Sequence, residues 1–152
     1  MSDFKFNVLT VLPERLNVIT SKLGAAAGER YTDKDIKKIV TMGVVSNFAL
    51  AADGDDIEGF IDNIDGGPTA NGFVVGGVAH PDTGFRVEAA VAAGAAPVAV
   101  KDYVVAGAQL PLGTKGLPQV KKGTPAVFKY RVMRIVSGTG GPGSVLVLER
   151  VA

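Results

Sequence analysis

The sequence contains no cysteine and no tryptophan, and it has a single histidine, His80. Without cysteine there is no disulfide, no thiolate metal ligand and no cysteine nucleophile, so folding does not depend on an oxidising compartment. One histidine leaves too few nitrogen and sulfur ligands for a zinc site. A Ser–His–Asp triad would have to use His80, but the chain has no G-x-S-x-G elbow. We therefore interpret His80 as a turn residue beside Pro81.

Long apolar runs are also missing. No stretch approaches the ~20 residues that a membrane-spanning helix requires. The short charged segment at the start of the chain is not followed by the apolar run of a signal peptide. These patterns predict a soluble protein that is made in the cytoplasm and does not insert into a membrane.

Strand and turn signals fill most of the 152 residues, of which 47% are apolar. Twenty glycines and eight prolines favour many turns, and no long helical pattern competes with them. Short strands at regular spacing predict a mostly β fold, a small barrel or sandwich with at most short helices. The candidate strands are 39–45, 48–51, 57–64, 72–79, 85–92, 98–105, 120–122, 127–137 and 144–151.

Some local patterns make sharper predictions. Thr32 and Asp35 have the spacing of a capping box, which predicts a short helical turn. In the strand 127–137 the alternation fails after Val132, and a bulge near Met133 would restore it. The last strand is apolar on both faces, as a central strand would be. The segment "GTGGPG" (138–143) matches a dinucleotide motif, but a strand follows it, so we interpret it as a hairpin turn.

The first 30 residues differ from the rest. Residues 4–12 could form a strand, Pro13 suits the first turn of a short helix, and 24–30 are small and flexible. We therefore divide the chain into an N-terminal arm (1–30) and a β-barrel or sandwich domain (31–152). An apolar strand on a loose tether predicts pairing with a second copy or another protein. The candidate interface residues in this arm are Phe4, Phe6 and Val8.

The stretch "LAADGDDIEGFIDNIDGG" (50–67) carries six carboxylates. It fails the calcium-loop template, because position five is Ile57 and position twelve is Ile64. Weak binding of a hard cation and a paired-carboxylate hydrolase remain alternatives, although the latter needs substrate-binding aromatics. We favour a solvated turn that leads into a strand, with no metal, cofactor or catalytic residue.

Charge is unevenly distributed along the chain, although the net charge is only +1. Residues 39–85 hold seven acidic and no basic side chains, and residues 86–152 hold nine basic and three acidic ones. The two blocks could attract a partner or a second copy, or folding could mix them on one surface. A sequence pI near 7.9 disfavours nucleic acid as the partner. The candidate interface residues in these blocks are Asp55, Asp56, Glu58, Lys129 and Arg131.

Several segments occur in a familiar order: "YTDKDIKKIVTM", "ALAADGDDIEGFIDNI", "GFVVGGVA", "FRVEAAV", "DYVVAGAQLPLGTKG" and "YRVMRIVSGTGGPGSVLVLERV". Together they resemble the small capsid decoration (cement) proteins of tailed bacteriophages, over residues 31–152. The resemblance implies a virion protein, not an enzyme, made in the host cytoplasm. It would bind the major capsid protein on the outer shell surface, without a cofactor and as a dimer or trimer. The alternatives are another phage component, such as a tail-tube or head-completion protein, and a barrel-type ligand-binding or enzyme domain.

Overall fold

The described part of the chain is almost entirely β-structure. In the computed structural model this part comprises residues 8–10, 16–26, 28–43, 47–65 and 72–152. The strands are β1 (Val8–Thr10), β2 (Leu16–Leu23), β3 (Ile39–Met42), β4 (Phe48–Leu50), β5 (Gly59–Ile64), β6 (Val74–Pro81), β7 (Arg86–Val91), β8 (Tyr103–Ala106), β9 (Gln119–Lys122), β10 (Tyr130–Ser137) and β11 (Val145–Arg150). A single turn of 3-10 helix, η2 (Asp33–Asp35), is present among these residues. The predicted fold class, mostly β with at most short helices, is confirmed.

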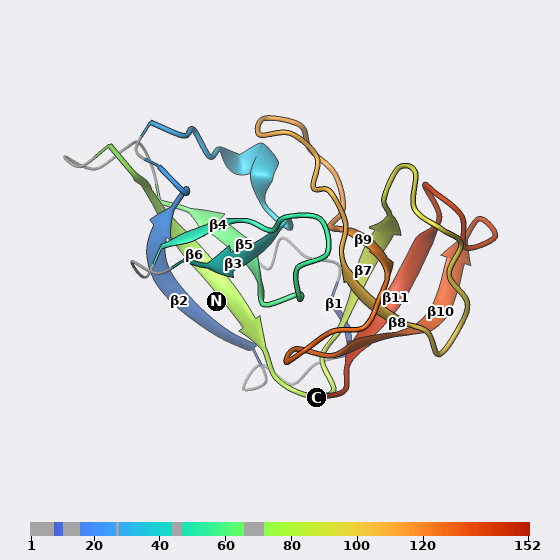
Figure 1. The fold of residues 1–152 in the computed structure, drawn as a ribbon. Helices are drawn as coiled ribbons and strands as arrows, with labels where there is room; N and C mark the ends of the chain where they lie inside the picture. Colours follow the sequence, from blue (N-terminus) through green and yellow to red (C-terminus); the bar gives the residue numbers. More distant parts are fainter. Residues whose placement is uncertain (1–7, 11–15, 27, 44–46, 66–71) are drawn as a thin grey trace.

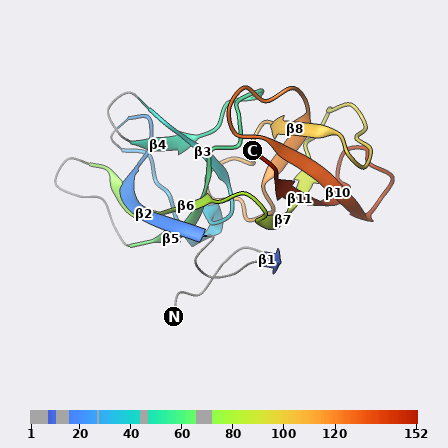
Figure 2. The same ribbon diagram turned by 90° about the horizontal axis from the view of Figure 1, so that it is seen from below.

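The strands close into two barrels that stand side by side (Figure 1). Barrel 1 consists of β2 to β6 in the spatial order β2-β4-β3-β5-β6. Barrel 2 consists of β7 to β11, because β9 pairs with β7 and closes the sheet β7-β11-β10-β8-β9. Strand β1 lies beside β7 and pairs with it antiparallel (Figure 2). The sequence predicted one barrel or sandwich, and the structure contains two barrels.

Most predicted strands are present, with ends displaced by at most three residues. The bulge predicted near Met133 is confirmed, because the register with β11 shifts between Val132 and Arg134. The capping box is confirmed as well: Thr32 Oγ1 accepts from Lys34 N, and Asp35 accepts from Thr32 N. The segment 138–143 is the turn of the hairpin formed by β10 and β11, and β11 is central in its sheet, between β7 and β10.

The segment 98–105 was predicted as one strand, but only its last part is β8. The preceding residues form a turn in which Asp102 N donates to Ala99 O (3.1 Å) and Ala99 N donates to the Asp102 carboxylate (2.8 Å). Lys101, inside this turn, has a φ of 78°. The turn interrupts the strand because its hydrogen bonds are local.

The prediction that residues 1–30 form an arm outside the core is wrong for β2. All eight residues of β2 pair with β6, and Leu23 also pairs with Phe48 in β4. Leu23 is fully buried in the core of barrel 1. The helix predicted after Pro13 is also wrong from Leu16 onward, and the boundary at residue 30 falls inside barrel 1. The candidate residues Phe4 and Phe6 lie outside the described part of the chain, whereas Val8 lies in β1.

The buried side chains form two clusters, one inside barrel 1 and one that fills barrel 2 and reaches barrel 1. A cluster of buried side chains in barrel 2 continues into barrel 1 through Ile39, Ile57 and Phe60. The rings of Phe60 and Tyr130 meet edge to face with 6.1 Å between centroids, a favourable aromatic geometry. The short connection between β6 and β7 is fastened to the end of β11, where Gly84 N donates to Arg150 O (2.7 Å). These contacts hold the two barrels directly against each other.

The connectivity of barrel 1 is repeated in barrel 2. In each, the first strand pairs parallel with the third and antiparallel with the fifth. The second strand pairs antiparallel with the third and the fourth, and the fourth with the fifth. Strands β2 to β6 thus correspond in order to β7 to β11. Two adjacent barrels with the same connectivity indicate an internal structural repeat.

The residue registers also coincide. Each fourth strand carries a bulge, directly after Ile61 in β5 and after Val132 in β10. When the bulges are aligned, all five pairings agree in register, so the barrels have the same stagger. Five pairs of buried positions, in which every residue is at most 1% exposed, then match. These matched residues are Leu23 and Val91, Val40 and Val104, Phe48 and Val120, Ile61 and Val132, and Val78 and Leu148.

Candidate functional site

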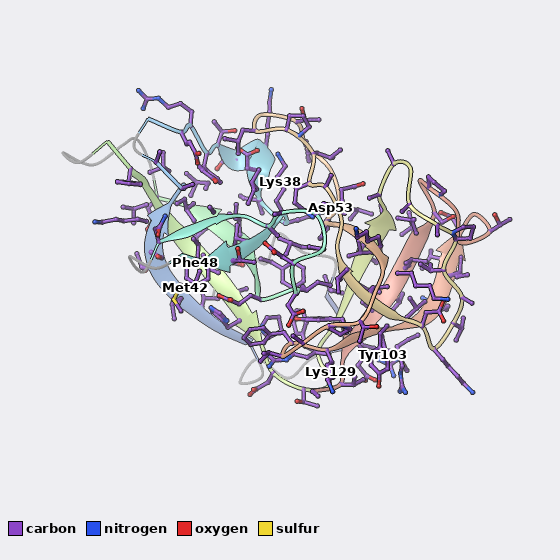
Figure 3. The ribbon with its side chains drawn as sticks, in the orientation of Figure 1. Lys38, Met42, Phe48, Asp53, Tyr103 and Lys129 are labelled. Atoms are coloured by element: carbon purple, nitrogen blue, oxygen red, sulfur yellow. The ribbon has the colours of Figure 1, made fainter. Side chains whose placement is uncertain are left out.

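Four of the six carboxylates of the acidic stretch lie at the seam between the barrels, in the connection 51–58 that joins β4 to β5. Gly54 N donates to Ala106 O, and Ala106 N donates to Asp55 O, each at 2.8 Å. Because Ala106 ends β8, these bonds attach the connection to barrel 2. Figure 3 shows Asp53 on this connection, between the two barrels. The stretch therefore has a structural role within the chain.

Asp56 makes the most extensive contacts of these carboxylates. It accepts hydrogen bonds from the backbone N–H groups of Ala126 (2.9 Å), Val127 (2.6 Å) and Phe128 (3.0 Å). Desolvation raises the pKa of Asp56, but these three N–H groups lower it by more, so the pKa lies below its usual value. The connection 123–129 joins β9 to β10, so equivalent connections of the two barrels meet at this carboxylate.

Replacing Asp56 with alanine is expected to reduce the free energy of unfolding by about 1–2 kcal/mol, the range for hydrogen bonds to a charged but partly exposed group. In the unfolded chain the pKa of Asp56 is near 3.9. In the folded chain its pKa is lower than that value. The contribution is therefore complete above the unfolded pKa and disappears as the pH falls through the folded pKa. Urea melts at neutral and acidic pH give the free energies of unfolding of Asp56→Ala and of the parent chain. The difference between these two free energies should become smaller as the pH falls. Asp53→Ala, which removes a 58% exposed carboxylate, is the matched control. Equal losses in the two variants would contradict the role of Asp56.

The other two acidic interface candidates also have partners within the chain. Asp55 accepts from Ala52 N (2.9 Å), and Glu58 accepts from Met42 N (2.9 Å). Nearby, Asp53 forms an ion pair with Lys121 (2.9 Å), which joins the acidic block to the basic one. Folding therefore brings the two charge blocks together inside one chain, which was one of the two outcomes expected. A role for Asp55, Asp56 and Glu58 toward a partner stays a prediction.

The basic candidates Lys129 and Arg131 lie at the beginning of β10. Lys129 is exposed, and its backbone pairs with the end of the chain: its N–H donates to Ala152 O (3.0 Å), and its carbonyl accepts from Val151 N (2.9 Å). Arg131 is half-buried, and its Nε has no hydrogen-bond partner among the described residues. Figure 3 shows Lys129 near Tyr103 on barrel 2. Of these two basic candidates, Lys129 is the one whose side chain is exposed to solvent.

A buried ion pair at the other side of the seam was not predicted. Asp35 and Lys38 are fully buried and contact each other directly. The Asp35 carboxylate also accepts from Gly113 N (2.9 Å), and Lys38 Nζ donates to Pro111 O (2.7 Å). Both outer partners belong to the connection 107–118 between β8 and β9, so the ion pair attaches barrel 1 to barrel 2. The capping box identified Asp35, but no pattern identified Lys38 as buried.

His80 lies in β6 and not in a turn, so that interpretation was wrong. Its ring packs edge to face on Phe48, with 5.4 Å between centroids. Desolvation is the largest cause of its lowered pKa; Glu58 opposes this effect and Arg150 adds to it. His80 is therefore neutral at pH 7.

Within the described ranges, no group of three or more His, Cys, Asp or Glu residues is placed to hold a metal ion.

A cavity of about 450 Å³ opens beside η2, between the two barrels. Asp33, Ile36 and Lys37 line it from barrel 1. Lys115, Gly116 and Leu117 line it from the connection 107–118. Lys37 has a φ of 86°, which is unusual for a residue with a side chain. A small anion with an apolar part would meet two lysines and two apolar side chains here, against the single negative charge of Asp33.

Comparisons with protein-family models, with curated proteins and with solved structures find no match. No helix in the part of the chain that the structure describes is long and apolar enough to cross a membrane.

Proposed function

We propose that this chain is a capsid decoration protein that binds the outer surface of a tailed-phage head and holds neighbouring shell subunits together. It acts mechanically, without catalysis or a cofactor. The segments that resemble decoration proteins support this proposal. They supply η2, the connection 51–58 and strands of both barrels, so the resemblance involves both barrels, although it leaves out β2.

The observation that carries the proposal is the presence of exposed apolar side chains on both barrels. One apolar cluster reaches both barrels, and hydrogen bonds join the barrels at the connection 51–58 and at Lys38. A load applied to one barrel is therefore transmitted to the other. Figure 3 shows Met42 on barrel 1 and Tyr103 on barrel 2. The exposed apolar residues are Val18, Ile19 and Met42 on barrel 1, and Val100, Tyr103, Val127 and Val136 on barrel 2. A rigid body with two contact regions can bridge two neighbours.

Bridging stabilises a shell through linkage. A protein that binds the assembled lattice but not free subunits shifts the assembly equilibrium toward the lattice. When one contact has formed, the second becomes intramolecular and gains an effective concentration. Each contact can therefore be weak while the bridged lattice is stable. This mechanism requires both barrels to contact the shell at the same time.

The test uses heads of the phage that encodes this chain, prepared without the protein. The added protein should sediment with the heads and raise the temperature at which they break open. Met42→Asp and Tyr103→Asp should each weaken binding by about tenfold or more, because each places a charge in an apolar contact. Thr114→Asp, an exposed loop substitution, is the matched control. Heads that do not bind the protein, or that bind it with no gain in stability, would contradict the proposal.

Two other functions are distinguished by the same preparation. Polymerisation of the purified protein into tubes would favour a tail-tube component. A ligand-binding domain is favoured by the cavity at Lys37 and Lys115. For that function, a small dicarboxylate should raise the unfolding temperature of the chain, and Lys115→Met should abolish the rise.

A further inference from the structure

The internal repeat draws attention to one edge of β2. In barrel 2, the corresponding strand β7 has β11 on one edge and shares its other edge between β9 and β1. Strand β9 pairs there with Ala90 and Val91, and β1 pairs with Arg86 and Val87. Both ends of that edge of β7 are therefore paired. Its end near Arg86 is covered by a strand from outside the barrel.

Barrel 1 has the first of these two partners but not the second. Strand β4 pairs with β2 at Leu23, which matches Val91. In the aligned registers, Val18 and Ile19 match Arg86 and Val87, the residues that pair with β1. No described strand lies along this edge of β2 over residues 16–20. Among the described residues, this end of β2 therefore has no strand partner at the place where β7 binds an added strand.

The side chains show the same difference. Val87 is 1% exposed, whereas the matching Ile19 is 44% exposed and its neighbour Val18 is 40% exposed. Successive residues of a strand point to opposite faces, so both faces of β2 are open here. An open strand edge with apolar side chains is a template for pairing with another strand. Figure 1 shows β2 along the outer side of barrel 1, with its first residues beside the end of β6.

We propose that this edge of β2, residues 16–20, pairs antiparallel with the same edge of a second copy. The added strand on β7 is antiparallel, and a two-fold axis between copies gives the same arrangement on β2. The chain has one β1, and β7 already binds it. A symmetric pair satisfies two open edges at once. Residues 16–20 (Leu-Asn-Val-Ile-Thr) carry no charge, so the pairing brings no like charges opposite each other.

This pairing would create a dimer with a continuous sheet from one barrel 1 to the other. It does not depend on the proposed function, because it concerns the purified chain alone. Under that function, the dimer would present four barrels to the shell instead of two. Decoration of heads by a monomer would leave the proposed function standing and overturn the dimer.

Sedimentation equilibrium of the purified full chain tests the pairing. The parent chain should form a dimer, and the double variant Val18→Lys/Ile19→Lys should raise its dissociation constant by about tenfold or more, because four like charges would meet at the axis. Val136→Lys is the matched control, since Val136 is a strand residue in β10 with 48% exposure. It should remain dimeric. Thermal melts of both variants should match the parent at concentrations where the parent is monomeric.

A covalent measurement does not depend on affinity. Because the chain has no cysteine, a single introduced thiol can cross-link only to its copy. Oxidised Val18→Cys should yield a disulfide dimer, and Val136→Cys should not. A monomeric parent chain, or a dimer that the β2 variants leave intact, would overturn the proposal. A monomer whose β2 variants lose binding to phage heads would instead assign this edge to a strand of the shell.

Discussion

A chain that lacks residues 1–28 is expected to lose the cooperative unfolding transition of the full-length protein. The deletion removes β2, which contributes eight residue pairs with β6 and the pairing of Leu23 with Phe48. Barrel 1 would then open, and its buried residues Phe48 and Val78 would face solvent. The cluster that fills barrel 2 includes Ile39, Ile57 and Phe60 of barrel 1, so opening barrel 1 would disturb barrel 2 as well. Circular dichroism melts measure this directly.

Point variants in β2 make the same comparison without a deletion. Leu23→Ala should cost about 2–5 kcal/mol of unfolding free energy, the usual range for a fully buried leucine. Ile19→Ala, in the same strand but 44% exposed, should cost much less. If the truncated chain melts like the full chain and Leu23→Ala is neutral, then residues 1–28 are an arm after all and β2 is not part of the core.

Breaking the buried ion pair is the second large effect expected. Lys38→Met should lower the free energy of unfolding by about 3–5 kcal/mol, because it leaves the Asp35 carboxylate buried without its counter-charge. Adding Asp35→Asn should recover part of the loss, because it removes the buried charge. The single amide oxygen can still accept from one of the two N–H groups, Thr32 N or Gly113 N, which bond different oxygens of the carboxylate. Chemical denaturation of the single and double variants gives both values.

The matched control for this effect is the exposed ion pair of Lys121 and Asp53. Lys121→Met should cost no more than about 1 kcal/mol, because solvent screens a surface pair. A similar cost for Lys38→Met and Lys121→Met would contradict the view that the buried pair joins the barrels. So would a double variant that is less stable than Lys38→Met alone.

The strands of barrel 2 could be predicted because their signals are local. Phe85, Val87, Ala89 and Val91 alternate with polar or half-buried residues, and all four are buried. The bulge at Met133 was visible as a break in alternation. By contrast, β2 mixes apolar and polar residues on both faces, since part of it lies at an open edge. Its pattern did not distinguish a strand from a helix.

The internal repeat could not be predicted from the sequence, because the matched positions share burial and not identity. Gly76 of β6 matches Leu146 of β11, and Phe48 matches Val120. Gly76 is required in barrel 1, because a Cβ there would lie 2.4 Å from the carbonyl oxygen of Asn63. The repeat becomes visible only when strand pairings and bulges are aligned.

The candidate site was predicted only in part. The sequence identified the carboxylates of the connection 51–58, but their main partners are backbone N–H groups and a lysine from distant segments. Backbone donors leave no pattern in a sequence. The same holds for the burial of Lys38. Asp35 is its neighbour in the sequence, but Pro111 O reaches Lys38 only through the packing of the two barrels.

Under the proposed function a tailed phage encodes this chain, and cryo-electron microscopy of the heads of that phage is the most direct test. We expect density with two adjoining lobes, one for each barrel, on the outer surface of the shell and across a junction between subunits. Met42 and Tyr103 should lie in or beside contacts with different shell subunits. Density for this chain in the tail, inside the head or on a single subunit would contradict a cement function.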